Sequence, residues 1–155
     1  FQRDGEALLT RAKQEGFSVA LLYLDLDRFK PVNDTYGHEM GDILLQKVAI
    51  RLKETLRSTD LLARIGGDEF VLVLSATQGN DIVEVCNRLL NDIRRPFQVS
   101  GHQLSIDVSI GIAFCPEHSG DLDELLKFAD NAMYEAKAAR SGFKFYVPDT
   151  KRSSL

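Results

Sequence analysis

Four segments of the chain repeat apolar residues every three or four positions, which is the spacing of an amphipathic helix. We therefore predict helices over residues 5–15, 39–57, 81–94 and 121–139. Gly16 follows the first segment as a helix stop signal, and Asp121 begins the last as an N-cap. Pro96 closes the third segment, because proline does not continue a helix.

Six further segments are continuously apolar or alternate between apolar and polar residues, which predicts strands. They are residues 17–24, 61–65, 70–75, 97–99, 104–114 and 143–147. The first is apolar at nearly every position and fits a strand buried on both faces. Gly66 and Gly67 separate the second from the third, where we expect a hairpin with glycines at positive φ. The residues around Pro31, Asn33 and Gly37 are expected to form a loop.

This order of elements predicts an α/β (α+β) fold, in which a mixed or antiparallel central sheet is flanked by helices lying mainly on one face. The chain has 155 residues, of which 44% are hydrophobic and 27% are charged. That composition is typical of a globular domain and excludes a disordered chain, a collagen-like fibre and a coiled-coil rod. We expect one domain over residues 1–155, with residues 148–155 as a tail or linker.

Charge and cysteine usage narrow the class of protein further. Lys and Arg number 19 against 23 Asp and Glu, a net charge of −4 without a dense basic run, which argues against nucleic-acid binding. Cys86 and Cys115 lack CxxC partners, and no run approaches the 18 apolar residues of a membrane span, so we expect a cytoplasmic domain. The start at Phe1 indicates a piece of a longer protein, whose parent chain can be membrane-anchored.

Two clusters of acidic residues are the first candidates for chemistry. Asp25 and Asp27 end a buried strand, and strand alternation places both on the same side. Such a pair suits Mg²⁺, although it can equally cap the loop or pair with Lys and Arg. Gly66-Gly67-Asp68-Glu69 adds two acids at a hairpin tip where the backbone can approach a ligand, although a tight turn alone would also explain it.

The segment from Phe29 to Asp42 carries polar residues of the types that can contact a nucleotide. Lys30 can contact a phosphate, and an Asn with an Asp can read a guanine edge. Taken alone, Asn33 also fits an Asx turn and Asp42 a helix-start acid. The chain has no P-loop, no GxGxxG after a strand and no GxSxG, which argues against P-loop NTPases, Rossmann dehydrogenases and α/β-hydrolases.

Together, these segments resemble the GGDEF family of diguanylate cyclases. The matching sequences are DLDRFKPVNDTYGHEMGD at 25–42, RIGGDEF at 64–70, SIGIA at 109–113 and DLDELLKFADNAMYEAK at 121–137. The resemblance covers nearly the whole chain and implies a nucleotidyl-cyclase-like fold with a ferredoxin-like β-α-β core. It also implies that a homodimer joins two GTP molecules into cyclic di-GMP and releases two pyrophosphates, with sensor or EAL domains as neighbours in the parent chain.

The resemblance assigns a metal and catalytic role to four positions. It implies Mg²⁺, with Mn²⁺ as the alternative, bound by Asp25, the carbonyl of Leu26 and Asp68. Glu69 falls at the second acidic position of the family motif, so the expected catalytic residues are Asp68, Glu69 and Asp25.

The resemblance also implies a substrate site and an inhibitory site. The residues matched to GTP binding are Asn33 and Asp42 for guanine, Phe29, Lys30 and Lys137 near the phosphates, and Gly66 and Gly67 at the hairpin tip. Arg57 and Asp60 match an RxxD motif that binds cyclic di-GMP as an inhibitor, and Arg88 matches a second arginine for that ligand. A helix-terminal arginine followed by a turn aspartate is the alternative for that pair.

Two features depart from the family pattern. The DxLTGLxNR segment is absent, since the chain begins just after the point where it would end. Ser141 stands where a phosphate-contacting arginine is expected, and Arg140 is the available substitute one position earlier. The alternative function is therefore a catalytically silent GTP- or cyclic-di-GMP-binding module that regulates a neighbour such as an EAL phosphodiesterase. An adenylyl-cyclase-like or polymerase-like activity is a further alternative.

Overall fold

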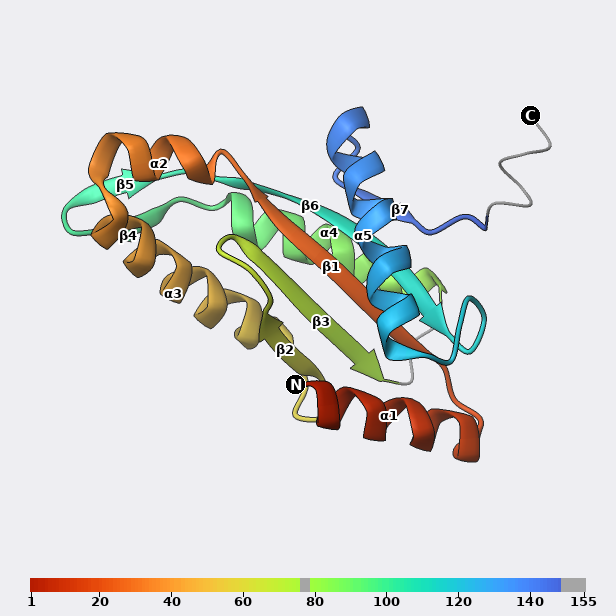
Figure 1. Ribbon diagram of the computed structural model, residues 1–155. Coiled ribbons are helices and arrows are strands. Elements are labelled where there is room, and N and C mark those ends of the chain that lie inside the picture. The colour runs from red at the N-terminus through yellow and green to blue at the C-terminus, as the bar shows by residue number, and fades with distance from the viewer. Residues whose placement is uncertain (76–78, 149–155) are drawn as a thin grey trace.

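The centre of the protein is a sheet of five strands in the order β2–β3–β1–β6–β7 (Figure 1). The computed structural model describes residues 1–75 and 79–148. The strands are β1 (Val19–Asp27), β2 (Leu61–Arg64), β3 (Glu69–Ser75), β6 (Asp107–Cys115) and β7 (Phe143–Phe145). β7 pairs with β6 in parallel, and all other neighbours are antiparallel. The mixed sheet confirms the predicted fold class.

Two interlocked β-α-β units form the core of this sheet. β1 and β2 run in the same direction on either side of β3, and they are joined by α2 (Phe29–Tyr36) and α3 (His38–Thr55). β3 and β6 likewise flank β1 and are joined through α4 (Gly79–Arg94) and a two-stranded sheet of β4 (Phe97–Val99) and β5 (His102–Leu104). This is the ferredoxin-like arrangement that the resemblance implied.

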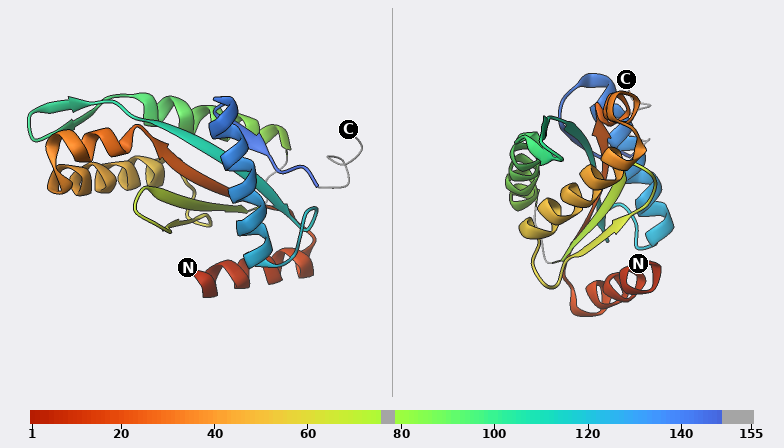
Figure 2. Two further views of the ribbon diagram at one scale, coloured as in Figure 1. Left: turned by 45° about the horizontal axis from the view of Figure 1, so that its top comes forward. Right: turned by 90° about the vertical axis from the view of Figure 1, so that its left-hand side faces the viewer.

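Helices cover both faces of the sheet, so the expectation that they lie mainly on one face is wrong (Figure 2). Both crossover helices, α3 and α4, pack on one face against strand residues such as Leu22 and Leu72. α1 (Gln2–Glu15) and α5 (Leu122–Ala139) cover the opposite face over Leu21 and Val73. A strand that is apolar at every position does not reveal which helix packs on which of its faces.

Residues 29–36 form helix α2 rather than the predicted loop. Pro31 is the third residue of this helix, where a missing N–H breaks no hydrogen bond within the helix. Phe29 and Val32 are buried and hold α2 against the core. Gly37, at φ 92°, ends α2 and begins α3, which explains a glycine between the two helices.

Among the other elements, whose ends shift by up to three residues, two strands differ from the prediction in a way that affects the site or the sheet. β1 extends to Asp27, so both aspartates of the 25–27 segment belong to the strand. The predicted strand 104–114 is divided between β5 and β6, because His102–Leu104 pairs with β4 outside the main sheet. The predicted cap of α5 is confirmed, since the Glu124 N–H donates to the Asp121 carboxylate at 3.0 Å.

Three expectations concern the chain as a whole. Cys86 and Cys115 are buried free thiols, in agreement with the absence of a disulfide framework. Across the described residues, every helix is too short or too polar to span a bilayer. The tail or linker expected at 148–155 lies, apart from residue 148, outside the described residues.

Candidate active site

Asp25 lies where three strands of the sheet meet. It is paired across β1 and β3 with Glu69, and across β1 and β6 with Ser109. Strand alternation places Asp25 and Asp27 on the same face as Tyr23, which is the face that α5 covers. The structure thus brings two of the predicted catalytic acids, Asp25 and Glu69, onto adjacent strands.

Glu69 accepts a hydrogen bond from the hydroxyl of Tyr23. Burial and the charge of Glu69 raise the pKa of Tyr23 to about 12, which keeps the hydroxyl protonated as a donor. Burial, followed by the charges of Asp25, Asp130 and Asp68, raises the pKa of Glu69. Tyr23 is not among the site residues predicted from the sequence, where the only available signal was its place two residues before Asp25 on the same strand face.

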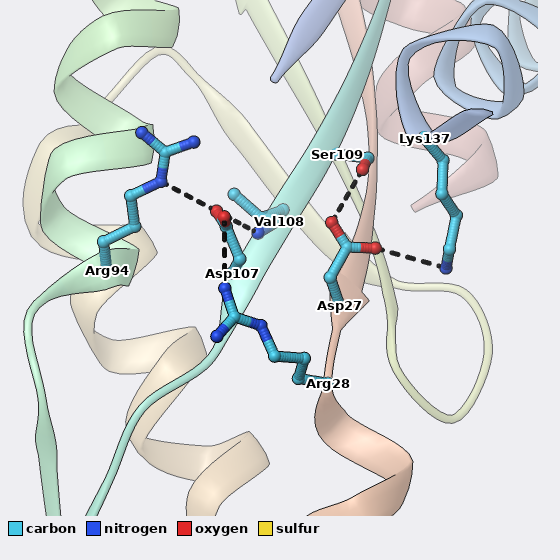
Figure 3. Close-up of polar contacts among 7 residues, drawn as sticks. All are labelled: Asp27, Arg28, Arg94, Asp107, Val108, Ser109 and Lys137. Carbon is cyan, nitrogen blue, oxygen red and sulfur yellow. Dashed lines mark hydrogen bonds and ion pairs between the residues drawn. The ribbon is translucent and has the colours of Figure 1, made fainter. Parts of the chain in front are cut away.

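Lys137 extends from α5 to both aspartates of β1. Its Nζ lies 2.7 Å from Oδ2 of Asp25 and 3.3 Å from Oδ1 of Asp27, and Figure 3 shows the contact with Asp27. Burial acts to lower the pKa of Lys137, but the hydrogen bonds and charges of Asp25 and Asp27 outweigh it and raise that pKa. The pKa of Asp25 is nevertheless raised, by burial and by the charges of Asp68 and Asp27. One ammonium group does not offset the acids around Asp25.

Segment 109–113 of β6 sets the distance between α5 and the end of β1. A Cβ on Gly111 would lie 2.8 Å from the Cα of Met133 and nearer still to the carbonyl oxygen of Ala129, so only glycine lets α5 pack this closely. Two residues earlier, the Ser109 hydroxyl donates to Oδ2 of Asp27 at 2.8 Å. Close packing at Gly111 therefore allows Lys137 to reach its partners.

Asp68 lies one residue beyond the last β1–β3 pair. The backbone N–H of Leu26 donates to the carbonyl of Asp68 at 3.0 Å, which fixes the hairpin tip beside Asp25. The tip is held from within as well, because Arg64 Nε donates to the carbonyls of residues 66 and 67 at 3.2 and 3.0 Å. The predicted metal ligands therefore lie on adjacent segments of backbone.

The expectation of positive φ at Gly66 and Gly67 is wrong, since neither glycine adopts it. The absence of a side chain at Gly66 and at Gly67 instead leaves space around the hairpin tip. A Cβ on Gly66 would lie 3.0 Å from Oε1 of Glu69, and a Cβ on Gly67 would have no atom within 4 Å. The first glycine leaves room for the Glu69 carboxylate, and the second leaves the hairpin tip open to a ligand.

The donor atoms at this site suit a hard cation. In the part of the chain that the structure describes, no three His, Cys, Asp or Glu side chains are arranged to share a metal ion. Asp25, Asp68 and the carbonyl of Leu26 nevertheless offer oxygen donors, and burial, followed by the charges of Asp68 and Asp27, raises the pKa of Asp25. Mg²⁺ commonly takes one or two carboxylates and completes its coordination with water and phosphate. The residues present therefore fit Mg²⁺.

A second polar group lies between α2 and α3. The Oδ1 of Asn33 is buried and has no hydrogen-bond partner among the described residues. Gly41 lies against it, because a Cβ on Gly41 would be 2.9 Å from the Asn33 Cγ and 3.3 Å from the ring of Phe29. Asp42 follows Gly41 and is exposed, and Lys30 is exposed on the first turn of α2. The predicted guanine residues thus come from two helices that pack together.

The RxxD residues tie the turn after α3 to the end of β3. The carboxylate of Asp60 accepts from the backbone N–H of Arg57 at 2.9 Å and of Ser75 at 3.3 Å, and Arg57 donates to the carbonyl of Ser75 at 2.7 Å. The Asp60 side chain is only 5% exposed and that of Arg57 is 59% exposed. Both line a cavity of about 350 Å³. Arg88 is exposed on α4 and is not among the described residues that line this cavity.

Ser141 and Arg140, which follow α5, make different contacts. The hydroxyl of Ser141 donates to the carbonyl of Phe143 at 3.3 Å. Arg140 ends the helix in the left-handed conformation, at φ 53°. Its side chain lines a cavity together with Lys137, so the substitute arginine lies on the same side as the predicted phosphate ligand.

A comparison with protein families shows the family of the chain. The family described as "Diguanylate cyclase, GGDEF domain" matches residues 1–142. The chain belongs to the GGDEF family. This GGDEF domain is 42% identical over 142 residues to the bifunctional diguanylate cyclase/cyclic di-GMP phosphodiesterase MucR of Pseudomonas aeruginosa, covering 91% of the chain and 21% of MucR.

A second relative is named as a phosphodiesterase and not as a cyclase. The cyclic di-GMP phosphodiesterase PdeR of Escherichia coli K12 is 40% identical over 132 residues, which cover 84% of this GGDEF domain and 20% of PdeR. The chain therefore spans about a fifth of the length of either relative.

The fold of the GGDEF domain agrees with a solved relative. The crystal structure of the GGDEF domain of TpbB from Pseudomonas aeruginosa superposes with a TM-score of 0.87 at 36% identity, covering 94% of this chain and 93% of that one. The family resemblance and the fold expected from it are both confirmed.

Proposed function

We propose that this GGDEF domain is a diguanylate cyclase that joins two GTP molecules into cyclic di-GMP across a homodimer. One observation carries the proposal most directly. Asp25 faces Glu69 across paired strands, beside Asp68 and within reach of Lys137. Acids held this close repel one another unless a cation lies among them, which suits the binding of a metal with a nucleotide triphosphate.

The α2–α3 region supplies the nucleotide contacts. We assign the unpartnered Oδ1 of Asn33 and the exposed carboxylate of Asp42 to the N–H groups of guanine, since both are acceptors. The backbone N–H groups of Phe29 and Lys30 lie in the first turn of α2, where no side chain caps the helix, and suit a phosphate. Lys137 and the open backbone at Gly66 and Gly67 complete the assignment.

The proposed reaction is a phosphoryl transfer. In each of two reciprocal steps, the 3′-oxygen of one GTP forms a bond to the α-phosphorus of the other and releases its proton to solvent, while the bond from that phosphorus to the α–β bridging oxygen breaks and pyrophosphate leaves with the electron pair. The two steps together close the cyclic product and release two pyrophosphates. Asp25, the Leu26 carbonyl and Asp68 would hold Mg²⁺ or Mn²⁺, which lowers the pKa of the attacking hydroxyl and offsets phosphate charge when bound. Tyr23 orients the Glu69 carboxylate through its hydrogen bond.

The need for two protomers follows from the product. Each chain offers one set of nucleotide residues, whereas cyclic di-GMP contains two equivalent nucleotides, so two domains must face each other about a two-fold axis. We further assign Arg57 and Asp60, with Arg88, to binding of the product as an inhibitor, because Arg57 and Asp60 border a cavity. GTP as substrate suits a cytoplasmic domain with sensor or EAL neighbours.

The second candidate function is a silent nucleotide-binding module that regulates an adjacent domain. The observation that favours it is Ser141, whose hydroxyl donates to a backbone carbonyl where a phosphate-binding arginine was expected. PdeR, a relative named only as a phosphodiesterase, is consistent with such a role.

Incubation of the domain with GTP and Mg²⁺ over a wide range of protein concentration tests the proposal. We expect cyclic di-GMP, measured by mass spectrometry, to rise faster than linearly with protein. The Asp68→Ala variant should form no cyclic di-GMP. The Asp123→Ala variant should form as much as the unmodified chain, because Asp123 is an exposed acid at the N-terminal end of α5, far along the helix from Lys137. Turnover by Asp68→Ala would contradict the assigned site. Absence of product from the unmodified chain under enforced dimerisation would favour the regulatory module.

A further inference from the structure

Asp27 is an acid of the site to which the proposed function gives no role. It ends β1, two residues after Asp25, and its side chain is 26% exposed. Its Oδ2 accepts a hydrogen bond from the Ser109 hydroxyl at 2.8 Å. Its Oδ1 is buried and lies 3.3 Å from Nζ of Lys137, but it has no well-aligned hydrogen bond among the described residues. One oxygen of Asp27 is therefore satisfied, and the other can still accept a hydrogen bond.

Ser109 fixes the direction of the Asp27 carboxylate. Its side chain is only 3% exposed, and Ser75 is the only other buried polar residue in the described part of the chain. Ser109 pairs with Asp25 across β1 and β6, so its hydroxyl lies on the same face of the sheet as both aspartates. Hydrogen bonds to a charged carboxylate are stronger than those between neutral groups. With Oδ2 held by Ser109, the other oxygen of Asp27 points at Lys137 (Figure 3).

Asp25 and Asp27 compete for the single ammonium group of Lys137. Its Nζ is 2.7 Å from Oδ2 of Asp25 and 3.3 Å from Oδ1 of Asp27, so Asp25 holds it more closely in this structure. Among the described residues, Lys137 forms ion pairs with these two acids alone. The lysine side chain has a flexible four-carbon stem, so Nζ can exchange between two carboxylates of one strand while the backbone stays in place.

A divalent cation at Asp25 would meet this ammonium group at close range. Two cations a few ångströms apart repel each other, and here both would need the lone pairs of the same carboxylate. Lys137 must therefore leave Asp25 when a cation binds there. Asp27 is placed to receive it, because its Oδ1 already lies beside Nζ and would gain the hydrogen bond that it lacks.

We propose that Asp27 and Ser109 are positioning residues that take Lys137 from Asp25 when a divalent cation binds. The inference rests on the proposed function for the assignment of Asp25 as a metal ligand. Lys137 covers Asp25 in the absence of the cation, and Asp27 keeps the ammonium group beside the site in its presence. Ser109 makes this exchange possible, since it holds the Asp27 carboxylate in the orientation that receives Nζ.

Binding of Mn²⁺ to the 155-residue chain without nucleotide, measured by electron paramagnetic resonance of the free ion, tests the exchange. Ser109→Ala changes no charge but releases the Asp27 carboxylate, so we expect the dissociation constant for Mn²⁺ to rise about threefold to tenfold. Ser105→Ala, at an exposed serine just before β6, is the matched control and should leave that constant unchanged. Equal Mn²⁺ affinity of the Ser109→Ala variant and the unmodified chain would overturn the inference, and so would an unmodified chain that binds no Mn²⁺.

Lys137→Met distinguishes transfer of the ammonium group from a direct effect on Asp25. Methionine keeps an unbranched side chain but carries no charge, so Asp25 loses its competing cation and we expect about tenfold tighter Mn²⁺ binding. In this background Ser109→Ala should have no effect, because there is no ammonium group to transfer. If Ser109→Ala weakens Mn²⁺ binding equally with and without Lys137, then Ser109 acts on Asp25 directly and the inference is wrong.

Asp27→Asn is the second variant, in case Ser109→Ala does not fold. Asparagine keeps the size of the side chain and an acceptor for the Ser109 hydroxyl, but it removes a charge. The exchange therefore corresponds only to the part of its effect on Mn²⁺ affinity that disappears in the Lys137→Met background. An effect of the same size in both backgrounds would be simple electrostatics and would also overturn the inference.

A parallel turnover assay separates this inference from the proposed function. With GTP as substrate, the Ser109→Ala variant should need about threefold to tenfold more Mg²⁺ for half-maximal formation of cyclic di-GMP, while Ser105→Ala should need no more than the unmodified chain. If Mn²⁺ binding depends on Ser109 and Lys137 as described but no cyclic di-GMP forms, the inference stands and the cyclase proposal fails. If cyclic di-GMP forms and Mn²⁺ affinity does not depend on Ser109, the cyclase proposal stands and the inference fails.

Discussion

The ammonium nitrogen of Lys137 lies 2.7 Å from a carboxylate oxygen of Asp25, a contact that joins the last turn of α5 to the end of β1 across 112 residues of sequence. The two groups carry opposite charges, and each is placed to bind a different part of a metal–nucleotide complex. Asp25 needs a cation because burial and nearby acids raise its pKa, and Lys137 is a cation that a phosphate could equally engage. The position of α5 on the sheet therefore controls the site.

Gly111→Ala tests that control. Its methyl group would collide with the backbone of Ala129 and Met133, so α5 must shift away from β6 and carry Lys137 with it. We expect a loss of about 1–3 kcal/mol in the free energy of unfolding, measured in urea, together with reduced turnover. Gly67→Ala, where no atom lies within 4 Å of the added Cβ, should change stability by less than about 0.5 kcal/mol. Equal stability of the two variants would contradict the close packing at Gly111.

Glu69 should make stability depend on pH. Burial and then the charges of Asp25, Asp130 and Asp68 raise its pKa above the ordinary 4.5, so between 4.5 and the raised value the folded chain binds more protons than the unfolded chain. The contribution of Glu69 to stability is therefore lost as pH rises through this window.

Glu69→Gln keeps an acceptor for Tyr23 but has no charge. Urea unfolding at a series of pH values should show the variant more stable than the unmodified chain near about pH 7, with the difference vanishing below about pH 4. The same variant should lose turnover if Glu69 is catalytic. A variant that is less stable at neutral pH would mean that the Glu69 charge is already compensated in the folded chain.

Asn33→Ala should separate guanine from adenine recognition. Its buried Oδ1 lacks a partner among the described residues, so a guanine N–H would gain a hydrogen bond there. We expect the affinity for GTP to fall about tenfold and the affinity for ATP to stay the same, both measured by calorimetric titration. Asp34→Ala, an exposed neighbour on the same helix, should leave both affinities unchanged. Parallel losses for the two nucleotides would assign Asn33 to packing against Gly41.

The two RxxD residues should respond differently to substitution. Asp60 is nearly buried and accepts two backbone hydrogen bonds, so Asp60→Ala should lower the free energy of unfolding by about 1–3 kcal/mol. Arg57 is more exposed, so Arg57→Ala is the better probe of inhibition and should relieve it in assays of rate against added cyclic di-GMP. An unchanged inhibition curve in a folded Arg57→Ala domain would leave the pair a purely structural role.

The Arg140→Gly variant should be more stable than the unmodified chain and bind its ligand more weakly. Glycine adopts the left-handed conformation of this position without the steric cost that arginine bears, which stabilises the folded variant. The greater entropy of glycine in the unfolded chain offsets part of this gain, so we expect the free energy of unfolding, measured in urea, to rise by about 0.5–1 kcal/mol. The affinity of the variant for GTP should fall, since the cavity that Arg140 shares with Lys137 loses one positive charge. A variant that is less stable would show that the Arg140 side chain supports the end of α5.

Local sequence determined most of the elements and the identity of the acidic residues. Apolar spacing predicted α1, α3, α4 and α5, because one face of each packs on a sheet and the pattern repeats for several turns. The apolar run before Asp25 predicted β1, and the GGDEF motif located the hairpin tip. Helix α2 was missed because eight residues with a proline and several turn-forming side chains carry too short a pattern.

Tertiary structure decided which residues meet. Only pairing across β1 and β3 brings Tyr23 and Asp25 next to Glu69, and only the packing of α5 over Gly111 brings Lys137 to Asp25. Arg28, Arg94 and Arg140 line one cavity although they come from three distant segments, and nothing in the sequence around Arg94 or Asp107 marks those two residues as neighbours. Spacing along a chain specifies which face of an element a residue occupies, whereas contacts between elements depend on how the elements pack.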